Sequence, residues 1–127
     1  MSLPAIALIL FCVILAALTV FQIALIVGAP LGHFAWGGQH RVLPRKLRIS
    51  SVTSIVLYAA FALIALDRTG VIELLPREVS VVLMWVLTGY FALGIVLNGI
   101  SRSVPERNLM TPVCLVLALL SWAIAVS

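Results

Sequence analysis

Four apolar segments, each long enough to cross a lipid bilayer, limit what this chain can fold into. They cover about residues 3–27, 49–66, 79–100 and 110–126. Roughly 17 to 25 apolar residues in a helix cross the hydrocarbon core of a membrane. In that core each backbone N–H and C=O must be bonded within the protein, which leaves only helices or closed β-barrels.

The apolar segments favour helices over a barrel because they lack the alternating apolar and polar residues of barrel strands. We therefore predict an all-α integral membrane protein, folded as an antiparallel four-transmembrane-helix bundle. Residues 1–127 would form a single membrane domain, in which the longest polar loop covers residues 28–48.

Composition agrees with a membrane setting. The chain is 64% hydrophobic and 9% charged, whereas soluble domains carry roughly 25% charged residues. Its net charge of +4 could suit nucleic acid, but the basic residues flank the apolar segments, where they set orientation in the membrane. We therefore expect no nucleic-acid partner. The expected partners are membrane lipids, anionic lipids included.

The distribution of Lys and Arg predicts which loops face the cytoplasm, where basic residues accumulate. Six basic residues lie in the first and third loops: Arg41, Arg45, Lys46, Arg48, Arg102 and Arg107. The second loop has only Arg68 and Arg77, which three acidic residues offset. Loops one and three are thus expected in the cytoplasm and both termini outside. We expect a multi-pass protein of the bacterial inner (plasma) membrane.

A weak internal repeat suggests an alternative description as two tandem helical hairpins. Residues 18–21 (LTVF) resemble 87–90 (LTGY), and residues 43–46 (LPRK) resemble 104–107 (VPER). Both hairpins would start outside, so they would be parallel repeats about an axis along the membrane normal. Apolar sequences match readily by chance, so duplication and coincidence both remain open.

Polar residues recur every four positions on two of the apolar segments. The two series are Ser50, Ser54 and Tyr58, and Tyr90, Gly94, Asn98 and, one position early, Ser101. Residues four apart share one helix face. Such stripes are typical of interhelical packing, which requires no ligand. The strongest hydrogen-bonding groups, Gln22 among them, lie toward the cytoplasmic end, which favours a polar pocket there as the alternative.

The first loop holds both histidines, His33 and His40, as well as Trp36. Imidazole is a common metal ligand and a general base. A metal site would require a third ligand, for which Glu106 is the only cytoplasmic carboxylate. A catalytic histidine could activate a serine of the same end. Without either chemistry, both histidines are polar residues of the membrane interface, which is the favoured interpretation, and the cofactor is unknown.

These observations favour a non-enzymatic protein that binds a small or lipid-like molecule near its cytoplasmic face, with translocation as an extension of that function. The alternatives are a structural or regulatory subunit of a larger membrane complex and a membrane enzyme using a loop histidine. Four short helices enclose little space, so a solute pathway would require a homodimer or larger assembly. The candidate ligand-binding residues are Gln22, His33, Trp36, His40, Ser50, Ser54, Asn98, Ser101 and Arg102.

Overall fold

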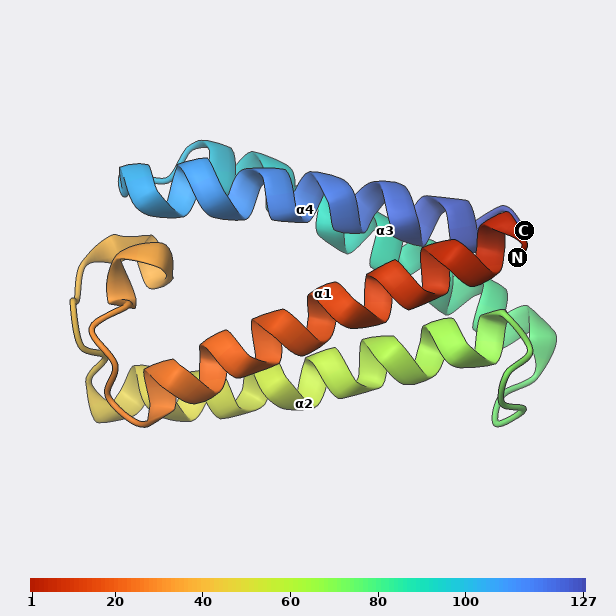
Figure 1. Ribbon diagram of the computed structural model, residues 1–127, viewed down its shortest axis with the longest axis horizontal. Coiled ribbons are helices and arrows are strands. Elements are labelled where there is room, and N and C mark those ends of the chain that lie inside the picture. Colours follow the sequence, from red (N-terminus) through yellow and green to blue (C-terminus); the bar gives the residue numbers. More distant parts are fainter.

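The computed structural model describes all residues 1–127 and contains helices but no strands. Its elements are α1 (Leu3–Ile26), η1 (Gly32–Phe34), η2 (Trp36–Gly38), α2 (Arg45–Arg68), α3 (Arg77–Gly99) and α4 (Val104–Ala125), where η denotes a short 3-10 helix. All four α-helices are long and apolar enough to cross a membrane. Successive α-helices run in opposite directions, so both termini lie at one end of the molecule (Figure 1).

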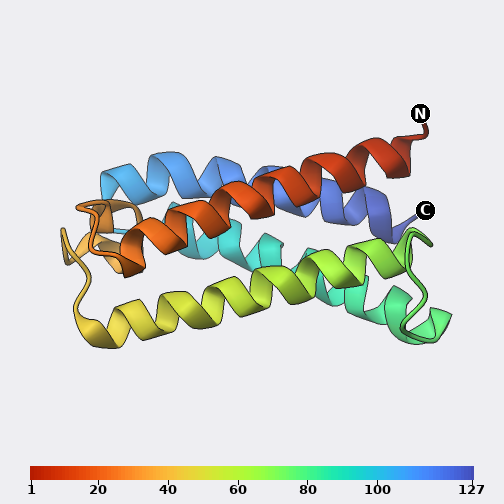
Figure 2. The same ribbon diagram turned by 60° about the horizontal axis from the view of Figure 1, so that its bottom comes forward.

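The helices pack most extensively as two consecutive pairs, α1 with α2 and α3 with α4. Contacts of α1 with α4 and of α2 with α3 join the pairs. Helices α1 and α4 lie close together near the termini and diverge toward the opposite end, as Figure 1 shows. The segment between α1 and α2 folds back over this wide end of the molecule (Figures 1 and 2).

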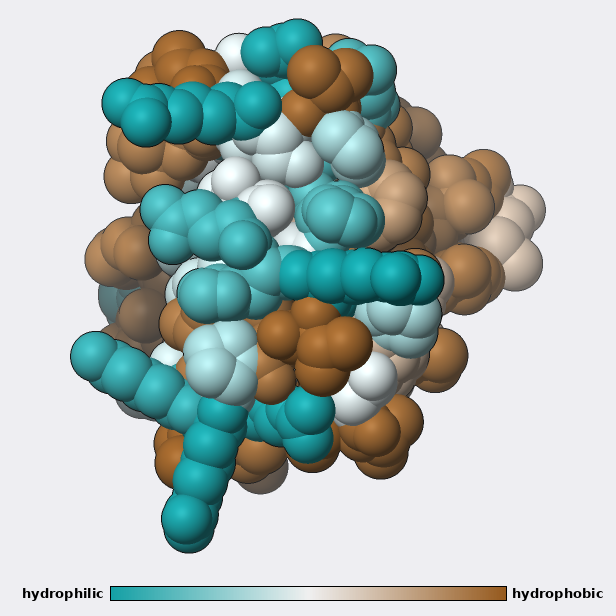
Figure 3. Space-filling model, turned by 90° about the vertical axis from the view of Figure 1, so that its left-hand side faces the viewer, coloured by the Kyte–Doolittle hydropathy of each residue, from teal (hydrophilic) through white to brown (hydrophobic).

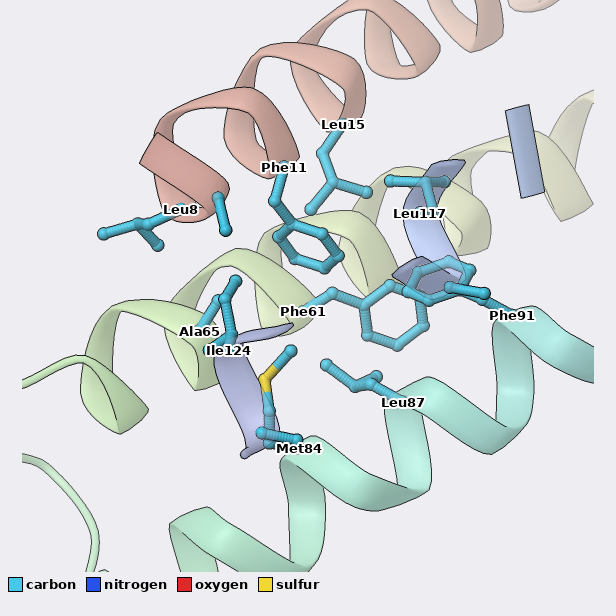
Figure 4. Packing of buried hydrophobic residues seen from close by; sticks show 13 residues of the cluster. Leu8, Phe11, Leu15, Phe61, Ala65, Met84, Leu87, Phe91, Leu117 and Ile124 are labelled. Atoms are coloured by element: carbon cyan, nitrogen blue, oxygen red, sulfur yellow. The ribbon is translucent and has the colours of Figure 1, made fainter. Parts of the chain in front are cut away.

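The buried core occupies the half of the molecule that contains the termini. It is built from all four helices, and Phe11, Met84 and Ile124 within it are fully buried (Figure 4). The Phe91 ring meets Phe11 and Phe61 edge-on, with centroid distances of 5.8 and 5.7 Å. Edge-to-face contacts at such distances are favourable for aromatic pairs. The tightly packed core therefore lies at the end with the termini and does not fill the wide end.

Large apolar side chains also cover the outside of the helices. Val13, Val86 and Leu119, on three different helices, are between 57% and 59% exposed. Single exposed apolar residues are ordinary in soluble proteins, but contiguous apolar surfaces over whole helices are not. Together with the length of the helices, this surface suggests a multi-pass membrane protein.

Two helices begin earlier than the apolar segments do. Helix α2 begins at Arg45 rather than near residue 49, and α4 at Val104 rather than near 110. Apolar composition indicates which residues would lie within the hydrocarbon core. A helix can begin earlier, where a capping side chain accepts one of its first N–H groups or where proline has no N–H to satisfy. Pro44 immediately precedes α2, and the Ser103 hydroxyl accepts the Glu106 N–H at 3.4 Å to cap α4. The polar connection therefore ends at Pro44 rather than at residue 48.

Candidate functional site

A cavity of about 380 Å³ lies between the helices at the wide end of the molecule. We call it the central cavity. Nineteen residues from all four helices and from the α1–α2 connection line it, and fourteen of these are hydrophobic. Its polar side chains, apart from the two tyrosine hydroxyls, belong to Gln22, Ser54, Asn98 and Glu106. Phe91 and Leu117, which are part of the buried core, also belong to its wall.

Gln22 is the most deeply placed amide of the central cavity, with only 7% of the residue exposed. Its Nε2 donates a hydrogen bond to the Tyr58 hydroxyl at 3.4 Å, which connects α1 to α2. Its Oε1 is buried and has no hydrogen-bond partner. An unpaired buried acceptor costs about 1–3 kcal/mol, so this amide can still accept a hydrogen bond.

Asn98 connects α3 to α4 on the other side of the central cavity. Its Nδ2 donates to the Gly94 carbonyl at 2.8 Å and to Cys114 Sγ at 3.2 Å. Glycine at position 94 favours the close approach of the two helices, because a Cβ there would lie 3.0 Å from Cys114 Sγ and the thiol would have to shift. Both cysteines of the chain are free thiols. The Asn98 amide thus has a structural role as well as a place in the cavity wall.

The segment containing η1 and η2 closes the wide end of the central cavity. Phe34, Ala35 and Trp36 from this segment line the cavity. Trp36 has φ of +53° and is the only non-glycine residue with a positive φ. Such a conformation is unfavourable for a bulky side chain and persists only where surrounding structure imposes it. The Ser103 hydroxyl donates to the His33 carbonyl and so attaches the segment to the start of α4.

A second, more polar depression adjoins the central cavity on the end face of the molecule. We call it the end hollow; its lining residues are His33, Gly37, Gly38, Gln39, Leu97, Ser101, Arg102, Ser103 and Glu106. Leu97 and Glu106 line both spaces. Figure 3 shows that hydrophilic side chains gather on this end face. The mainly apolar central cavity thus adjoins the polar end hollow.

Glu106 stands between the two spaces and is half-buried. Its Oε2 accepts a hydrogen bond from the Ser101 hydroxyl at 2.6 Å. The same hydroxyl accepts the Ser103 N–H at 3.2 Å. In a capping box the Glu106 carboxylate would accept the Ser103 N–H directly. Here the Ser101 hydroxyl lies between these two groups and bonds to both. These bonds hold the carboxylate at the boundary of the two spaces.

Seven of the nine predicted site residues line one of these two spaces. Gln22, Trp36, Ser54 and Asn98 line the central cavity, and His33, Ser101 and Arg102 line the end hollow. Ser50 and His40 line neither. The Ser50 hydroxyl donates to the Lys46 carbonyl of its own helix at 3.3 Å, and His40 is exposed.

Most of the cavity residues were not among the predicted site residues, and Tyr58 and Glu106 are two that bond to other groups there. Tyr58 follows Ser54 at helical spacing, so the periodicity of α2 already placed it on the same face. Glu106 lies in the first turn of α4. Only the packing of the loop and α3 against that turn places its carboxylate beside an apolar cavity.

No three His, Cys, Asp or Glu side chains come together in the structure as a potential metal-binding group. Comparison of the chain with protein-family models, curated proteins and solved structures found no match. The kind of ligand that the site can bind is therefore inferred from its own side chains. The central cavity, which is mainly apolar and has a few hydrogen-bonding groups, adjoins the polar end hollow, and this arrangement suits a molecule with an apolar body and a polar head.

Proposed function

We propose that this is a multi-pass membrane protein that binds a small amphiphilic molecule at its cytoplasmic end. The apolar body of the ligand would occupy the central cavity, and its polar head would lie at the end hollow. The adjoining position of the two spaces supports this arrangement. The cavity volume of about 380 Å³ falls in the range of roughly 300–1,000 Å³ of small-molecule sites.

The unpaired Oε1 of Gln22 is the observation that carries the proposal. The Oε1 atom is itself buried, so it would gain a partner from a ligand that presents an O–H or N–H group once the Gln22 amide turns toward the cavity. Among the buried side-chain groups without a partner, only that of Gln22 belongs to a residue that lines either space. The buried core lies between the cavity and the end with the termini, so this conformation supports binding, and translocation would require the core to open.

Membrane insertion and orientation are part of the same proposal. The apolar outside of the four helices supports insertion as an antiparallel bundle. Six basic residues lie at the wide end, in the connections that follow α1 and α3 and in the first turns of α2 and α4. The positive-inside rule places this end in the cytoplasm, with both termini outside. In a bacterial inner membrane these residues would face anionic headgroups, each attraction being worth about 1 kcal/mol.

Cysteine labelling in intact cells tests the orientation. We expect a membrane-impermeant maleimide to label Glu73→Cys from outside, and to label His40→Cys only after permeabilisation. Both positions are exposed and lie at opposite ends of the molecule. The background variant Cys12→Ala/Cys114→Ala removes the native thiols. The opposite labelling pattern would place the site outside and overturn the cytoplasmic assignment.

Ligand binding is tested with a brominated alkyl glucoside, an uncharged amphiphile whose bromine atoms quench a tryptophan on contact. In nanodiscs, a Trp85→Phe/Trp122→Phe background leaves Trp36 as the only reporter. We expect saturable quenching, and an affinity about 3- to 10-fold lower for Gln22→Leu, because one hydrogen bond of roughly 0.5–1.5 kcal/mol is lost. Ser54→Ala should also weaken binding.

Ser50→Ala is the matched control for Ser54→Ala. Both hydroxyls donate to the carbonyl four residues earlier at 3.3 Å, but only Ser54 lines the cavity. The control should bind as the wild type does. Quenching that rises linearly with probe concentration and is unchanged by Gln22→Leu would contradict the proposal. A stoichiometric companion recovered in mild detergent would then favour a subunit of a larger complex.

A further inference from the structure

We infer that the ligand is a cationic amphiphile, with an ammonium group attached directly to its apolar chain and held by Glu106. The inference rests on the proposed function and specifies the ligand class of the same site. Its starting point is that Glu106 is the only charged side chain among the nineteen residues of the central cavity. No Lys, Arg or His lines that space.

The position of Glu106 defines where the charge of the ligand would lie. Because Glu106 lines both the central cavity and the end hollow, a molecule with its chain in the one and its head in the other passes this carboxylate. Its Oε2 accepts only the Ser101 hydroxyl in the structure, at 2.6 Å. A carboxylate has about four acceptor sites, so it retains capacity for an ammonium donor.

Arg102 and Arg107 are the competing charges, because Arg102 lines the end hollow and Arg107 Nη1 donates to the Ser101 carbonyl at 3.4 Å. Both arginines are exposed, whereas Glu106 is half-buried. Two charges at a given distance interact about four times more strongly at the effective dielectric of a protein boundary than in bulk water. Salt also screens the exposed charges more than the half-buried one. Glu106 therefore dominates the field where the chain of the ligand meets its head.

Aromatic rings give the second reason for a cation. Six of the cavity residues are aromatic: Phe21, Phe34, Trp36, Tyr58, Tyr90 and Phe91. The faces of such rings attract ammonium groups within roughly 6 Å of the ring centre, and the attraction is stronger where water is excluded. Trp36 comes from the same loop segment that closes the cavity beside Glu106. An anionic or neutral head would not gain this attraction.

The test compares three amphiphiles of one chain length in phosphatidylcholine nanodiscs: dodecylammonium, whose head carries three N–H donors, dodecyl glucoside and dodecyl sulfate. Each displaces the brominated alkyl glucoside from the Trp36 reporter protein. We expect the ammonium compound to bind about tenfold more tightly than the glucoside. Glu106→Gln, which can still accept from Ser101, should reduce that preference to about twofold or less.

Glu73→Gln is the control, since it removes the same charge at the opposite end of the molecule. It should keep the wild-type preference, which separates a local effect from changes in net charge. Equal binding of ammonium compound and glucoside, or a preference that survives Glu106→Gln, would overturn the cationic assignment while the proposed function stands. Tighter binding of dodecyl sulfate would assign the head to Arg102 instead. Absence of saturable binding for all probes would remove the proposed function itself.

Discussion

Replacing Gly32 by alanine is expected to unfold the loop segment that closes the central cavity. A Cβ at this position would lie 1.8 Å from the carbonyl oxygen of His40 and 2.8 Å from that of Arg41. The clash is with backbone, so no side chain can turn aside. Moving the segments around Gly32 and Arg41 apart would also break the hydrogen bond from the Gly32 N–H to the Arg41 carbonyl at 2.9 Å.

We expect Gly32→Ala to destabilise the closed loop by roughly 3 kcal/mol, the upper part of the range for overpacked sites. Limited trypsin digestion in nanodiscs measures this through cleavage after Arg41, which should become about a hundredfold faster if cleavage follows local opening. Saturable quenching of Trp36 by the brominated glucoside should be lost in the same variant.

Gly37→Ala is the matched control in the same loop. Unlike Gly32, Gly37 has a positive φ, of +75°, but no atom lies within 4 Å of a Cβ there. Gly37→Ala should therefore destabilise the closed loop only by the cost of a left-handed backbone at a non-glycine residue, about 1–2 kcal/mol. It should remain less susceptible to trypsin than Gly32→Ala. Equal digestion of Gly32→Ala and the wild type would show that this loop does not adopt the described closed form.

The second large effect is expected for Phe11→Ala in the buried core. Phe11 is fully buried, and its ring contacts Phe91 edge-on at 5.8 Å. Truncation leaves a cavity and removes this contact. In soluble cores Phe→Ala costs about 3–5 kcal/mol. In the proposed membrane setting lipid would replace water as the solvent, so the transfer contribution would be smaller. We expect a loss of roughly 3 kcal/mol in unfolding by sodium dodecyl sulfate in mixed micelles.

Val13→Ala provides the comparison on the same helix. Val13 is 59% exposed, so its truncation removes contact with lipid or detergent rather than with protein. Its effect should stay within about 0.5 kcal/mol, as is usual for substitutions at surface positions. If both variants unfolded at the same detergent fraction, the four helices would not pack around Phe11 as described.

Much of the fold follows from local properties of the sequence. The number of long helices was predictable because apolar length alone distinguishes these segments, and four such helices are present. Their starts were less predictable. The basic first turn of α2 and the polar first turn of α4 do not resemble a membrane segment, yet both are helical because of proline or a serine cap.

The candidate site was only partly predictable. The four-residue spacing of Ser50, Ser54 and Tyr58 predicted a shared face, but spacing says nothing of how deep the cavity extends along that face. Ser54 and Tyr58 line it, and Ser50 does not. Nothing in the sequence around His40 distinguishes it from His33. Both are exposed, and only the path of the loop places His33 at the end hollow and His40 away from it.

The sequence by itself determined which segments are helical and apolar, and which end carries the basic residues, because these properties depend on neighbours within a few turns. Only the tertiary structure decided that α1 and α4 diverge, that the glycine-containing loop closes the wide end, and that Glu106 lines the same cavity as six aromatic residues. Those placements depend on residues such as Gln22 and Tyr58, or His33 and Ser103, that are far apart in the chain. Contacts between distant residues are set by packing of whole helices, which no local pattern encodes.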